Sequence, residues 1–312
     1  MSVSSPDNSN RVQVDWPGLR KPDQCIVCGS MEASLLYPPT FSGTMSDLPR
    51  YFLAHRTTTA HGPIVKCTAC DFVFTSPRFS PADYDAIYSE IPTPHEGVAD
   101  FDAAKSARFQ RLAAIVRKYR ASGAFLDFGC GDGAFLREMN DPAGSGFEIG
   151  TPGRRTAGRS EIFIGDWATF VASTNVSAGT LDFVTAFDVL EHLPRIEQDV
   201  ALIRSLLKPG GLFFASVPNV ESRVAKLMGK RWNMLLLEHL WYFSPRTFTA
   251  FLAKHGFVEV ELRSIPFDAP LAHLINRLAQ TFGMTGSLIP RGMAKIVLPV
   301  PAGIMLGVYR AV

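Results

Sequence analysis

The chain has 312 residues, of which 46% are hydrophobic and 19% charged, and its formal net charge is +2. This length is enough for one large α/β domain with a small appendage. Lysine and arginine are scattered along the chain, which argues against a dedicated nucleic-acid binder, because such proteins carry a basic stripe.

The two ends of the chain carry no predicted membrane or secretion signal. Residues 1–22 are expected to be a disordered tail and linker, since the first ten are polar and serine-rich and contain no apolar signal segment. The most apolar stretch, residues 296–312, contains Pro299 and Pro301 and is shorter than the about 20 apolar residues that a membrane span needs. We interpret it as a buried final strand and expect a cytoplasmic protein without a transmembrane segment.

Four of the five cysteines form two Cys-x-x-Cys pairs. The pairs are Cys25/Cys28 and Cys67/Cys70. In a chain without a secretory signal, such pairs indicate a metal rather than disulfides. Four thiolates can close a tetrahedral zinc site, which is structural because no position remains for water. We predict that zinc holds together residues 23–78, a segment too poor in core to fold alone. Free or redox-active thiols are the alternative, and His55 and His61 could substitute as ligands.

The rest of the chain alternates apolar strands with helices, which predicts an α/β fold with a parallel sheet and helices on both faces. Residues 79–122 are expected to be a helical linker and cover, with one helix that starts at Pro81 and another over 102–120. Strands are predicted over 124–128, 146–149, 161–164, 181–187, 212–217, 257–262 and 303–310. Further helices are predicted through 135–139, over 195–207 and from Ser244 to His255.

The first strand runs into a glycine-rich loop, Asp127-x-Gly129-x-Gly131-x-Gly133. Glycines let the backbone approach a ligand without a Cβ in the way, and the next helix offers free N–H groups. In a doubly wound sheet, ligands bind at this edge. Dinucleotide-binding folds use a similar loop, but the carboxylate of Asp127 would suit a ligand amino group and repel a pyrophosphate.

Two later strands also end in acidic residues. Glu148 could accept hydrogen bonds from both hydroxyls of a ribose, and simple surface exposure is the alternative. Asp166 could accept a hydrogen bond from the exocyclic amine of adenine, and an N-cap for the next helix is nearly as good an interpretation. Within the loop, Cys130 is interpreted as an inert small residue.

These motifs together resemble the motif series of class I S-adenosylmethionine (SAM)-dependent methyltransferases over about residues 105–265. The motifs are 127–133, Glu148, Asp166, the run 187–193 (FDVLEHL) and the run 207–211 (LKPGG). The resemblance implies a Rossmann-like, doubly wound, seven-stranded sheet with an antiparallel last strand. It also implies that residues 123–312 form a SAM-binding domain with substrate-covering C-terminal insertions.

The resemblance assigns each expected cofactor contact to a position of this chain. Asp127 and Gly129 would lie near the methionine part of SAM, Glu148 would hold the ribose, and Asp166 with Trp167 would flank the adenine. Asp188 would lie near the methionine end and the substrate, and Cys130, Gly131 and Phe187 complete the expected contacts. The short, arginine-rich stretch after Glu148 departs from the usual pattern, which leaves the adenine side less defined.

A cysteine-rich segment ahead of this domain resembles one subgroup, bacterial enzymes that methylate sugars, including nucleotide-linked deoxysugars, and related small molecules. The deoxysugar C-methyltransferases have a further large domain for which this sequence shows no counterpart. Tyr84 to Glu96, a helix over Val220 to Trp232 and residues 266–290 are expected to cover the substrate. Lys226, Lys230 and Arg231 of the middle segment could face an anionic group such as a diphosphate; the alternative, a solvated helix face, is the preferred interpretation.

Methyl transfer mainly requires that donor and acceptor be aligned, but a hydroxyl or carbon acid also needs a base. Segments similar to Glu238-His239-x-x-Tyr-Phe-Ser occur in the sugar methyltransferases, where the histidine can serve as base. We therefore predict His239 as the base, with Glu238 as the adjacent carboxylate that tunes its pKa; a hydrogen bond to the loop backbone is the alternative. His192 is assigned to packing or to shaping the cofactor site, and a catalytic role is the alternative. Without an additional acidic cluster, no catalytic metal is expected.

The predicted function is SAM-dependent methylation of a hydroxyl on a sugar, glycan precursor or natural-product small molecule. C-methylation of a nucleotide-linked deoxysugar is the nearest variant, and an inactive, zinc-stabilised SAM-binding scaffold is the alternative from another class. We expect a small-molecule partner, such as a sugar nucleotide or glycolipid precursor, and no nucleic acid. The apolar region 271–306 could hold a homodimer contact.

Overall fold

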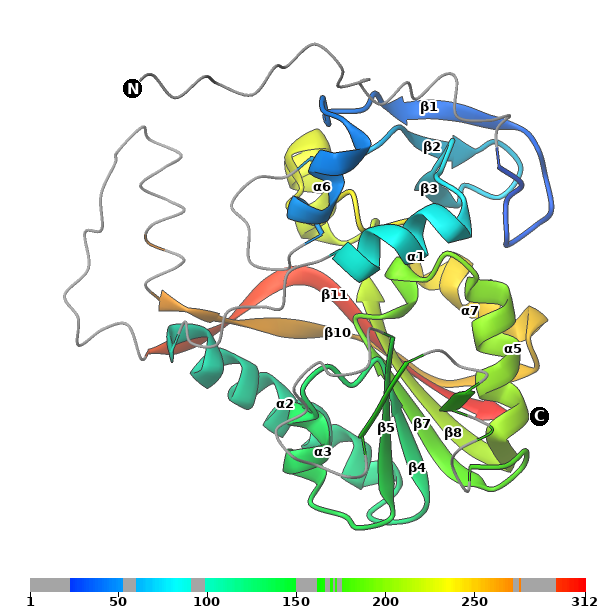
Figure 1. Ribbon diagram of the computed structural model, residues 1–312, viewed down its shortest axis with the longest axis vertical. Helices are drawn as coiled ribbons and strands as arrows, with labels where there is room; N and C mark the ends of the chain where they lie inside the picture. Colours follow the sequence, from blue (N-terminus) through cyan, green and yellow to red (C-terminus); the bar gives the residue numbers. More distant parts are fainter. Residues whose placement is uncertain are drawn as a thin grey trace, which may run out of the picture.

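The computed structural model describes residues 23–52, 60–90, 99–149, 162–165, 169, 170, 172, 176–271, 275 and 296–312. Within these ranges the chain forms two β-sheets with helices packed around them (Figure 1). The larger sheet has the strand order β10-β11-β8-β7-β4-β5-β6. Its strands are β4 (Phe125–Phe128), β5 (Gly144–Ile149), β6 (Ile162–Gly165), β7 (Leu181–Phe187), β8 (Leu207–Pro218), β10 (Phe257–Pro270) and β11 (Val297–Ala311).

Five neighbouring strands of this sheet, from β8 to β6, run parallel to one another. By contrast, β11 is antiparallel to both of its neighbours, β8 and β10. Parallel neighbours need long crossover connections, and the helices of the alternating pattern provide them. The predicted Rossmann-like α/β fold, with seven strands and an antiparallel last strand, is confirmed.

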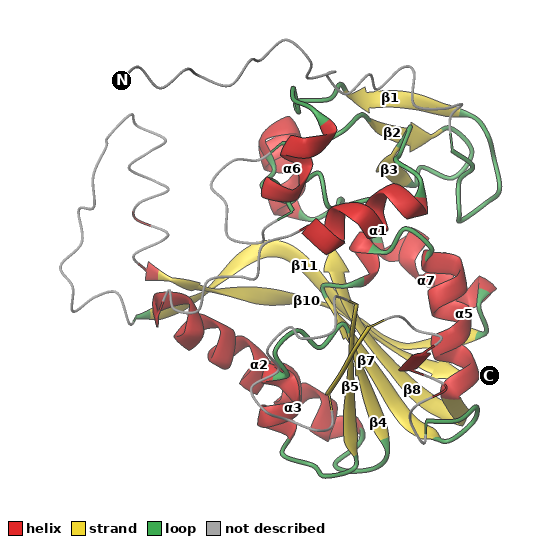
Figure 2. Cartoon of the chain, in the orientation of Figure 1, coloured by secondary structure: helices red, strands yellow, loops and turns green. Residues whose placement is uncertain are grey.

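The two faces of the larger sheet bury alternate residues of each strand, as a period of two requires. Phe125 and Phe183 stack with ring centroids 4.5 Å apart on the face covered by α2 and α3, whereas Leu126 and Val184 point to the opposite face. That opposite face is covered by α5 and α7 (Figure 2). These helices are α2 (Ala99–Tyr119), α3 (Ala134–Met139), α5 (Ile196–Leu206) and α7 (Pro245–Lys254).

A smaller antiparallel sheet, in the order β1-β2-β3-β9, contains the cysteine-bearing segment. Its strands are β1 (Ala33–Tyr37), β2 (Ile64–Cys67), β3 (Val73–Thr75) and β9 (Trp241–Tyr242). The last strand comes from the part of the chain that forms the larger sheet, and Phe74 pairs with Trp241 in the ladder. Trp241 also packs against Phe72 and donates a 2.8 Å hydrogen bond to the backbone carbonyl of Leu193. The two sheets therefore share one continuous hydrophobic core.

Most predicted elements lie where the sequence places them, and the differences have local causes. The fourth strand, 181–187, and the capped helix after Ser244 agree with prediction, and the side chain of Ser244 accepts from the backbone N–H of Thr247. The helix expected over 220–232 is shorter: α6 (Arg223–Met228) ends at Gly229, whose φ of +51° breaks the helix, and η3 (Gly229–Arg231) follows.

The last two strands are longer than predicted. The expected strands 257–262 and 303–310 extend to 257–270 and 297–311, because Phe267 to Pro270 pair with Val297 to Val300. Prolines in this extension are tolerated because, within the described ranges, β10 lies at the sheet edge and β11 pairs with β8 only from Ile304 onward, so that the extended part of β11 has a free edge as well. The apolar C-terminal stretch thus forms a strand, as predicted. Among the described residues, no helix combines the length and the apolar character that a bilayer crossing would require.

Candidate functional site

The four paired cysteines converge on one point. The Sγ atoms of Cys25 and Cys70 are 3.5 Å apart, those of Cys28 and Cys67 are 3.6 Å apart, and all four lie within 4.8 Å of one another. Thiolates bound tetrahedrally to one zinc ion at about 2.3 Å would lie about 3.8 Å apart. The four side chains therefore fit a closed zinc site.

Of the two histidines between the pairs, His61 does not join this cluster. The buried ring of His61 forms a 2.7 Å hydrogen bond with the backbone of Gly62, and His55 lies outside the described residues. Two basic side chains of α7 instead fix the cysteine loops: Arg246 donates to the carbonyl of Cys70 at 2.7 Å, and Lys254 to the carbonyl of Ile26 at 3.1 Å. The cysteine segment is thus fastened to the larger sheet through α7.

The glycine-rich loop leaves β4 with a backbone that only glycine adopts easily. Gly129 has a φ of +76°, and a Cβ added there would lie 2.4 Å from a methyl group of Val189. Gly131, with a φ of +56°, has no atom within 4 Å of the position of an added Cβ. The loop therefore packs closely on one side and leaves open space at Gly131, as a cradle for a ligand does.

Two carboxylates border this cradle from neighbouring strands. Asp127 is buried and accepts a 2.6 Å hydrogen bond from the hydroxyl of Thr185. Burial raises its pKa to about 7, against the lowering effect of that hydrogen bond. Glu148, at the end of β5, accepts a 2.7 Å hydrogen bond from the backbone N–H of Gly131. Both acids stand at the carboxyl ends of parallel strands, where the sequence predicts the methionine and ribose contacts.

The remaining predicted cofactor contacts divide into described and undescribed residues. Cys130 and Phe187 are buried, and the ring of Phe187 packs edge-on against Phe135 with centroids 5.0 Å apart. Cys130 fills the space beside Gly146, where an added Cβ would lie 2.7 Å from its Sγ. Asp166 and Trp167 lie outside the described residues, so the adenine side stays a prediction.

Asp188 stands at the end of β7 in a left-handed backbone conformation, with a φ of +56°. It accepts a hydrogen bond from Arg108 of α2 and a 2.7 Å hydrogen bond from the hydroxyl of Ser216. Positive φ in a non-glycine residue stores strain and is concentrated at functional sites. Arg108, whose guanidinium is largely buried, is a site residue that the sequence patterns did not reveal.

One group of acid and histidine side chains lies beyond Asp188. Glu191 and His192, on η2 (Leu190–His192), meet His239, and their ligand atoms all lie within 4.8 Å of one another. The two imidazole rings meet edge to face, with centroids 4.7 Å apart. Nδ1 of His239 is 2.8 Å from the backbone carbonyl of Met234. We call Glu191, His192 and His239 the histidine cluster.

The histidine cluster is strongly perturbed by burial. Burial lowers the pKa of His192 to about 4 and holds the pKa of His239 well below its ordinary value, with the neighbouring His192 adding to the effect. Burial, reinforced by the charge of Asp188, raises the pKa of Glu191 well above that of a free glutamate. Both imidazoles are therefore neutral at pH 7 and offer a lone pair.

Glu238 was predicted as the carboxylate beside His239, but the carboxylate that joins His239 in the cluster is Glu191. Burial raises the pKa of Glu238 to about 7. On α1 (Pro81–Glu90), burial raises the pKa of Tyr88, and the charges of Glu238, Glu148 and Glu191 add to this shift. Tyr88 therefore lies near the acids of the cofactor cradle and of the histidine cluster. That the segment from Tyr84 to Glu96 covers the substrate stays a prediction.

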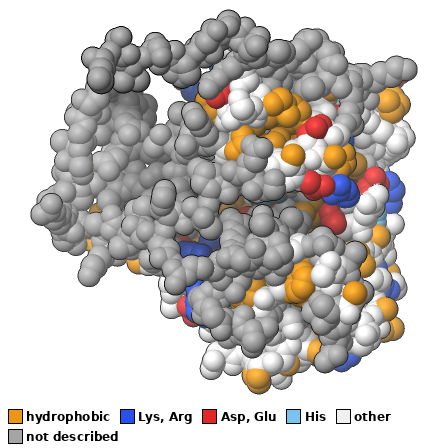
Figure 3. Space-filling view, viewed as in Figure 1, with side chains coloured by type: hydrophobic (Ala, Val, Ile, Leu, Met, Phe, Trp, Pro, Cys, Tyr) orange, Lys and Arg blue, Asp and Glu red, His pale blue; other side chains and the backbone are white. Residues whose placement is uncertain are grey.

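Residues 220–232, the second segment predicted to cover the substrate, are more exposed to solvent than the described side chains of α1. The side chains of Lys226, Lys230 and Arg231 are exposed, which fits the alternative of a solvated face. Most of residues 266–290 lie outside the described ranges. On the face shown in Figure 3, acidic and basic side chains meet at the boundary between the upper part, with α1 and the small sheet, and the larger sheet below.

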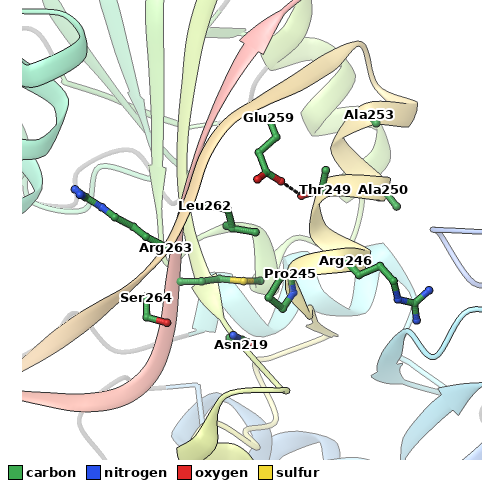
Figure 4. Close-up of a pocket in the computed structure, with 11 residues that line it drawn as sticks. Asn219, Pro245, Arg246, Thr249, Ala250, Ala253, Glu259, Leu262, Arg263 and Ser264 are labelled. Atoms are coloured by element: carbon green, nitrogen blue, oxygen red, sulfur yellow. Dashed lines mark hydrogen bonds between the residues drawn. The ribbon is translucent and has the colours of Figure 1, made fainter.

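A separate cavity of about 640 Å³ opens between α7 and β10 (Figure 4). Its walls include Arg246, Thr249, Glu259 and Arg263, and the hydroxyl of Thr249 donates a hydrogen bond to Glu259. Its lining contains no residue of the glycine-rich loop or of the histidine cluster. We therefore do not assign it to the cofactor or to the acceptor.

The sheet order, the glycine cradle and the acidic strand ends define a class I SAM-dependent methyltransferase. The chain belongs to the methyltransferase domain family, whose model matches residues 102–262. The zinc-binding subgroup suggested by the cysteine pairs is not identified by this match.

Similar curated proteins are named ubiquinone biosynthesis O-methyltransferases. That of Methylocella silvestris is 33% identical over 159 residues, or 46% of this chain and 61% of that protein. That of Cupriavidus pinatubonensis is 24% identical over 163 residues, or 48% of this chain and 65% of that protein. The match therefore spans less than two thirds of these relatives. A SAM-dependent methyltransferase structure from Archaeoglobus fulgidus aligns with a TM-score of 0.45 at 18% identity, covering 66% of this chain and 94% of that one.

Proposed function

We propose that this methyltransferase transfers the methyl group of SAM to a hydroxyl of a sugar, glycan precursor or natural-product small molecule. The observation that carries the proposal is the histidine cluster beside Asp188. Two neutral imidazoles stand past the end of β7, where the resemblance implies that Asp188 lies near the methionine end of the cofactor and the substrate. A hydroxyl acceptor loses a proton during methylation, and a neutral imidazole beside it can accept that proton.

SAM, when bound, supplies an electrophilic methyl group on a sulfonium. Asp127, just before the glycine-rich loop, would hold the amino group of its methionine part, and Glu148, which accepts a hydrogen bond from Gly131, would hold the ribose hydroxyls. His239 is the candidate base in the metal-free protein, because its Nδ1 is directed at the carbonyl of Met234 and its Nε2 keeps a lone pair. The word O-methyltransferase in the relatives' names supports an oxygen acceptor.

We also propose that a structural zinc ion occupies the four-cysteine site. Its support is the spacing of the Sγ atoms, 3.5 Å and 3.6 Å for two of the pairs, which matches a tetrahedral thiolate site. A zinc ion there would hold β2 and the cysteine loops against α7, and it would leave no position for substrate.

The function is tested by calorimetric titration of zinc-replete protein with SAM and with its demethylated product. Binding of both, weakened by Asp127→Asn or Glu148→Gln and preserved in the remote Glu32→Gln variant, supports the cofactor site. The same protein is then incubated with sugar nucleotides, glycolipid precursors and polyhydroxylated natural products. The mass of each product and the position of its new methyl group distinguish O-methylation from C-methylation of a deoxysugar. SAM binding without methylation of any hydroxyl compound would contradict the proposed acceptor class.

A further inference from the structure

Glu191 is an unusual carboxylate for the interior of a protein. Its side chain is 1% exposed, and its Oε2 has no hydrogen-bond partner among the residues that the structure describes. A buried carboxylate oxygen without a partner is costly, because the solvation that it loses is not replaced. A carboxylate oxygen of Glu191 belongs to the histidine cluster, whose ligand atoms converge within 4.8 Å. A cation at that point would balance the charge of the carboxylate.

Each histidine of the cluster can present a lone pair, because its ring has a hydrogen-bond partner in the backbone. The ring of His239 is anchored through Nδ1 to the carbonyl of Met234 at 2.8 Å, and the ring of His192 is hydrogen-bonded to the backbone of Glu238. When one ring nitrogen is committed to a backbone carbonyl, the tautomer is set and the other nitrogen is free to bind. Metal-binding histidines are held by such outer hydrogen bonds.

The backbone that carries the cluster is fixed from both sides. Glu191 and His192 are adjacent on η2, and the N–H of His192 donates to the carbonyl of Val189 at 3.0 Å. The N–H of Leu240, the residue after His239, donates to the carbonyl of Glu191 at 2.7 Å. This hydrogen bond ties the two halves of the cluster together independently of any ion, so the three side chains form a site that exists before a ligand binds.

We infer that Glu191, His192 and His239 form a binding site for one divalent transition-metal ion. Ligand atoms about 2.1 Å from one ion lie at most about 4.2 Å apart, so small side-chain rotations from the present spacing complete the site. Two imidazoles with one carboxylate favour manganese, iron, cobalt, nickel or zinc over magnesium, which prefers oxygen ligands. This inference replaces the sequence-based expectation of no catalytic metal.

Three protein ligands leave positions on the ion for a small molecule. Given the proposed function, those positions would take a hydroxyl oxygen of the acceptor. Two neighbouring hydroxyls would bind more tightly than one, which favours a vicinal diol, as in a sugar. The bound ion makes the hydroxyl more acidic; its proton goes to water, and the oxygen is left to bond to the methyl carbon as the carbon–sulfur bond breaks. Nε2 of His239 then acts as a ligand instead of a base.

Manganese binding tests the histidine cluster directly, because four thiolates bind Mn²⁺ poorly and the cysteine site will not take it up. The full-length protein is loaded with zinc, dialysed against a chelator until one zinc per chain remains, and titrated with Mn²⁺ while the electron paramagnetic resonance signal of free Mn²⁺ is followed. We expect one Mn²⁺ per chain. Glu191→Gln should weaken this binding by at least about tenfold, and the matched change Glu261→Gln on β10 should leave it unaltered.

Two controls keep the test decisive. An unchanged SAM affinity of Glu191→Gln shows that the variant is folded; if it does not fold, His192→Gln replaces it. Cobalt added to the zinc-loaded wild-type protein should give a visible spectrum without the intense sulfur-to-cobalt band of a thiolate site. The inference is overturned if the protein binds no Mn²⁺, Co²⁺ or Zn²⁺ beyond the one zinc on the cysteines. It is also overturned if wild type and Glu191→Gln bind the ion equally well. In that case, undiminished methylation of a hydroxyl in chelator would leave the proposed function standing.

Discussion

The hydroxyl of Thr75, on β3 of the cysteine-bearing sheet, donates a 3.0 Å hydrogen bond to the backbone carbonyl of His239. The backbone N–H of Thr75 also donates to the carbonyl of Leu240 at 2.9 Å. The strand that begins three residues after Cys70 thus holds the main chain of a histidine-cluster residue. A change at the cysteines can therefore reach the acceptor side of the site without touching the cofactor cradle.

This connection predicts the effect of disrupting the cysteine site. Cys28→Ser, which changes the exposed cysteine of the four, should weaken zinc binding and loosen β3. A displacement of about 1 Å at a reacting group can lower turnover on the order of a hundredfold, so kcat should fall far more than SAM affinity. Zinc content, kcat and calorimetric SAM affinity are measured on the same sample. Cys130→Ser is the matched control, and its zinc content should stay at the wild-type value. Equal losses of SAM affinity and kcat would contradict the predicted connection.

The position of His239 in the histidine cluster predicts that its substitution lowers turnover without lowering SAM affinity. His239→Ala should keep SAM affinity and lower kcat by about 10²- to 10⁴-fold, the range of a lost acid–base group. The expectation is the same whether Nε2 of His239 accepts a proton or binds an ion. His255→Gln, a histidine at the end of α7, is the control and should retain turnover. Single-turnover kinetics with SAM in excess give the comparison, and wild-type turnover in His239→Ala would remove His239 from the mechanism.

Asp127 predicts how SAM binding depends on pH. Its pKa is about 7 in the ligand-free protein, and a bound ammonium group lowers the pKa of a neighbouring carboxyl. SAM binding near pH 7 should therefore release roughly half a proton, and affinity should rise between about pH 6 and pH 8. Calorimetry in buffers with different ionisation enthalpies measures the proton release.

Thr185→Val provides the matched variant for this prediction. It removes the hydrogen bond that lowers the pKa of Asp127, so the rise in affinity should move to higher pH. Asp127→Asn should abolish the pH dependence that this carboxyl causes. Identical pH profiles in all three proteins would mean that Asp127 does not titrate on binding.

A comparison of Gly129 with Gly179 separates the stability cost of crowding a Cβ into the loop from the cost of its backbone conformation. Both have positive φ, +76° and +68°, but only Gly129 has a neighbour, Val189, in the way of a Cβ. Gly179→Ala should cost about 1–2 kcal/mol of unfolding free energy from conformation alone. Gly129→Ala should cost about 1–3 kcal/mol more from overpacking, and it should also weaken SAM binding. Denaturant unfolding measures the loss of unfolding free energy in each variant. Similar losses in both variants would show that the side chain of Val189 moves aside at little cost.

The larger sheet and the cofactor cradle could be predicted because their signals are local. Asp127, Gly129 and Glu148 follow apolar strands directly, and a parallel sheet brings the ends of such strands to one edge. The capped helix at Ser244 was equally readable, because the capping residues are neighbours in the sequence. The ends of strands β10 and β11 were missed because their extension depends on mutual pairing.

The parts of the site that the sequence did not reveal depend on long-range packing. Arg108 lies in a helix with several other charged residues, and its pairing with Asp188, 80 positions later, has no local signature. Glu191 was placed in a motif, but its position against His239 is set by the contact of Leu240 with η2. The two-residue strand β9 is too short to give a periodic pattern.

The contribution of β9 to the small sheet limits how this enzyme can be divided or recombined. A chain that began at residue 79 would leave Trp241 without Phe72 and Phe74, the rings that cover it, and would expose the open edge of β9 to other chains. Exchanging the cysteine segment with that of another methyltransferase would require the partner strand to be exchanged as well. For protein engineering, residues 23–78 and the segment around β9 are therefore one inseparable unit, although some 160 residues of sequence lie between β3 and β9.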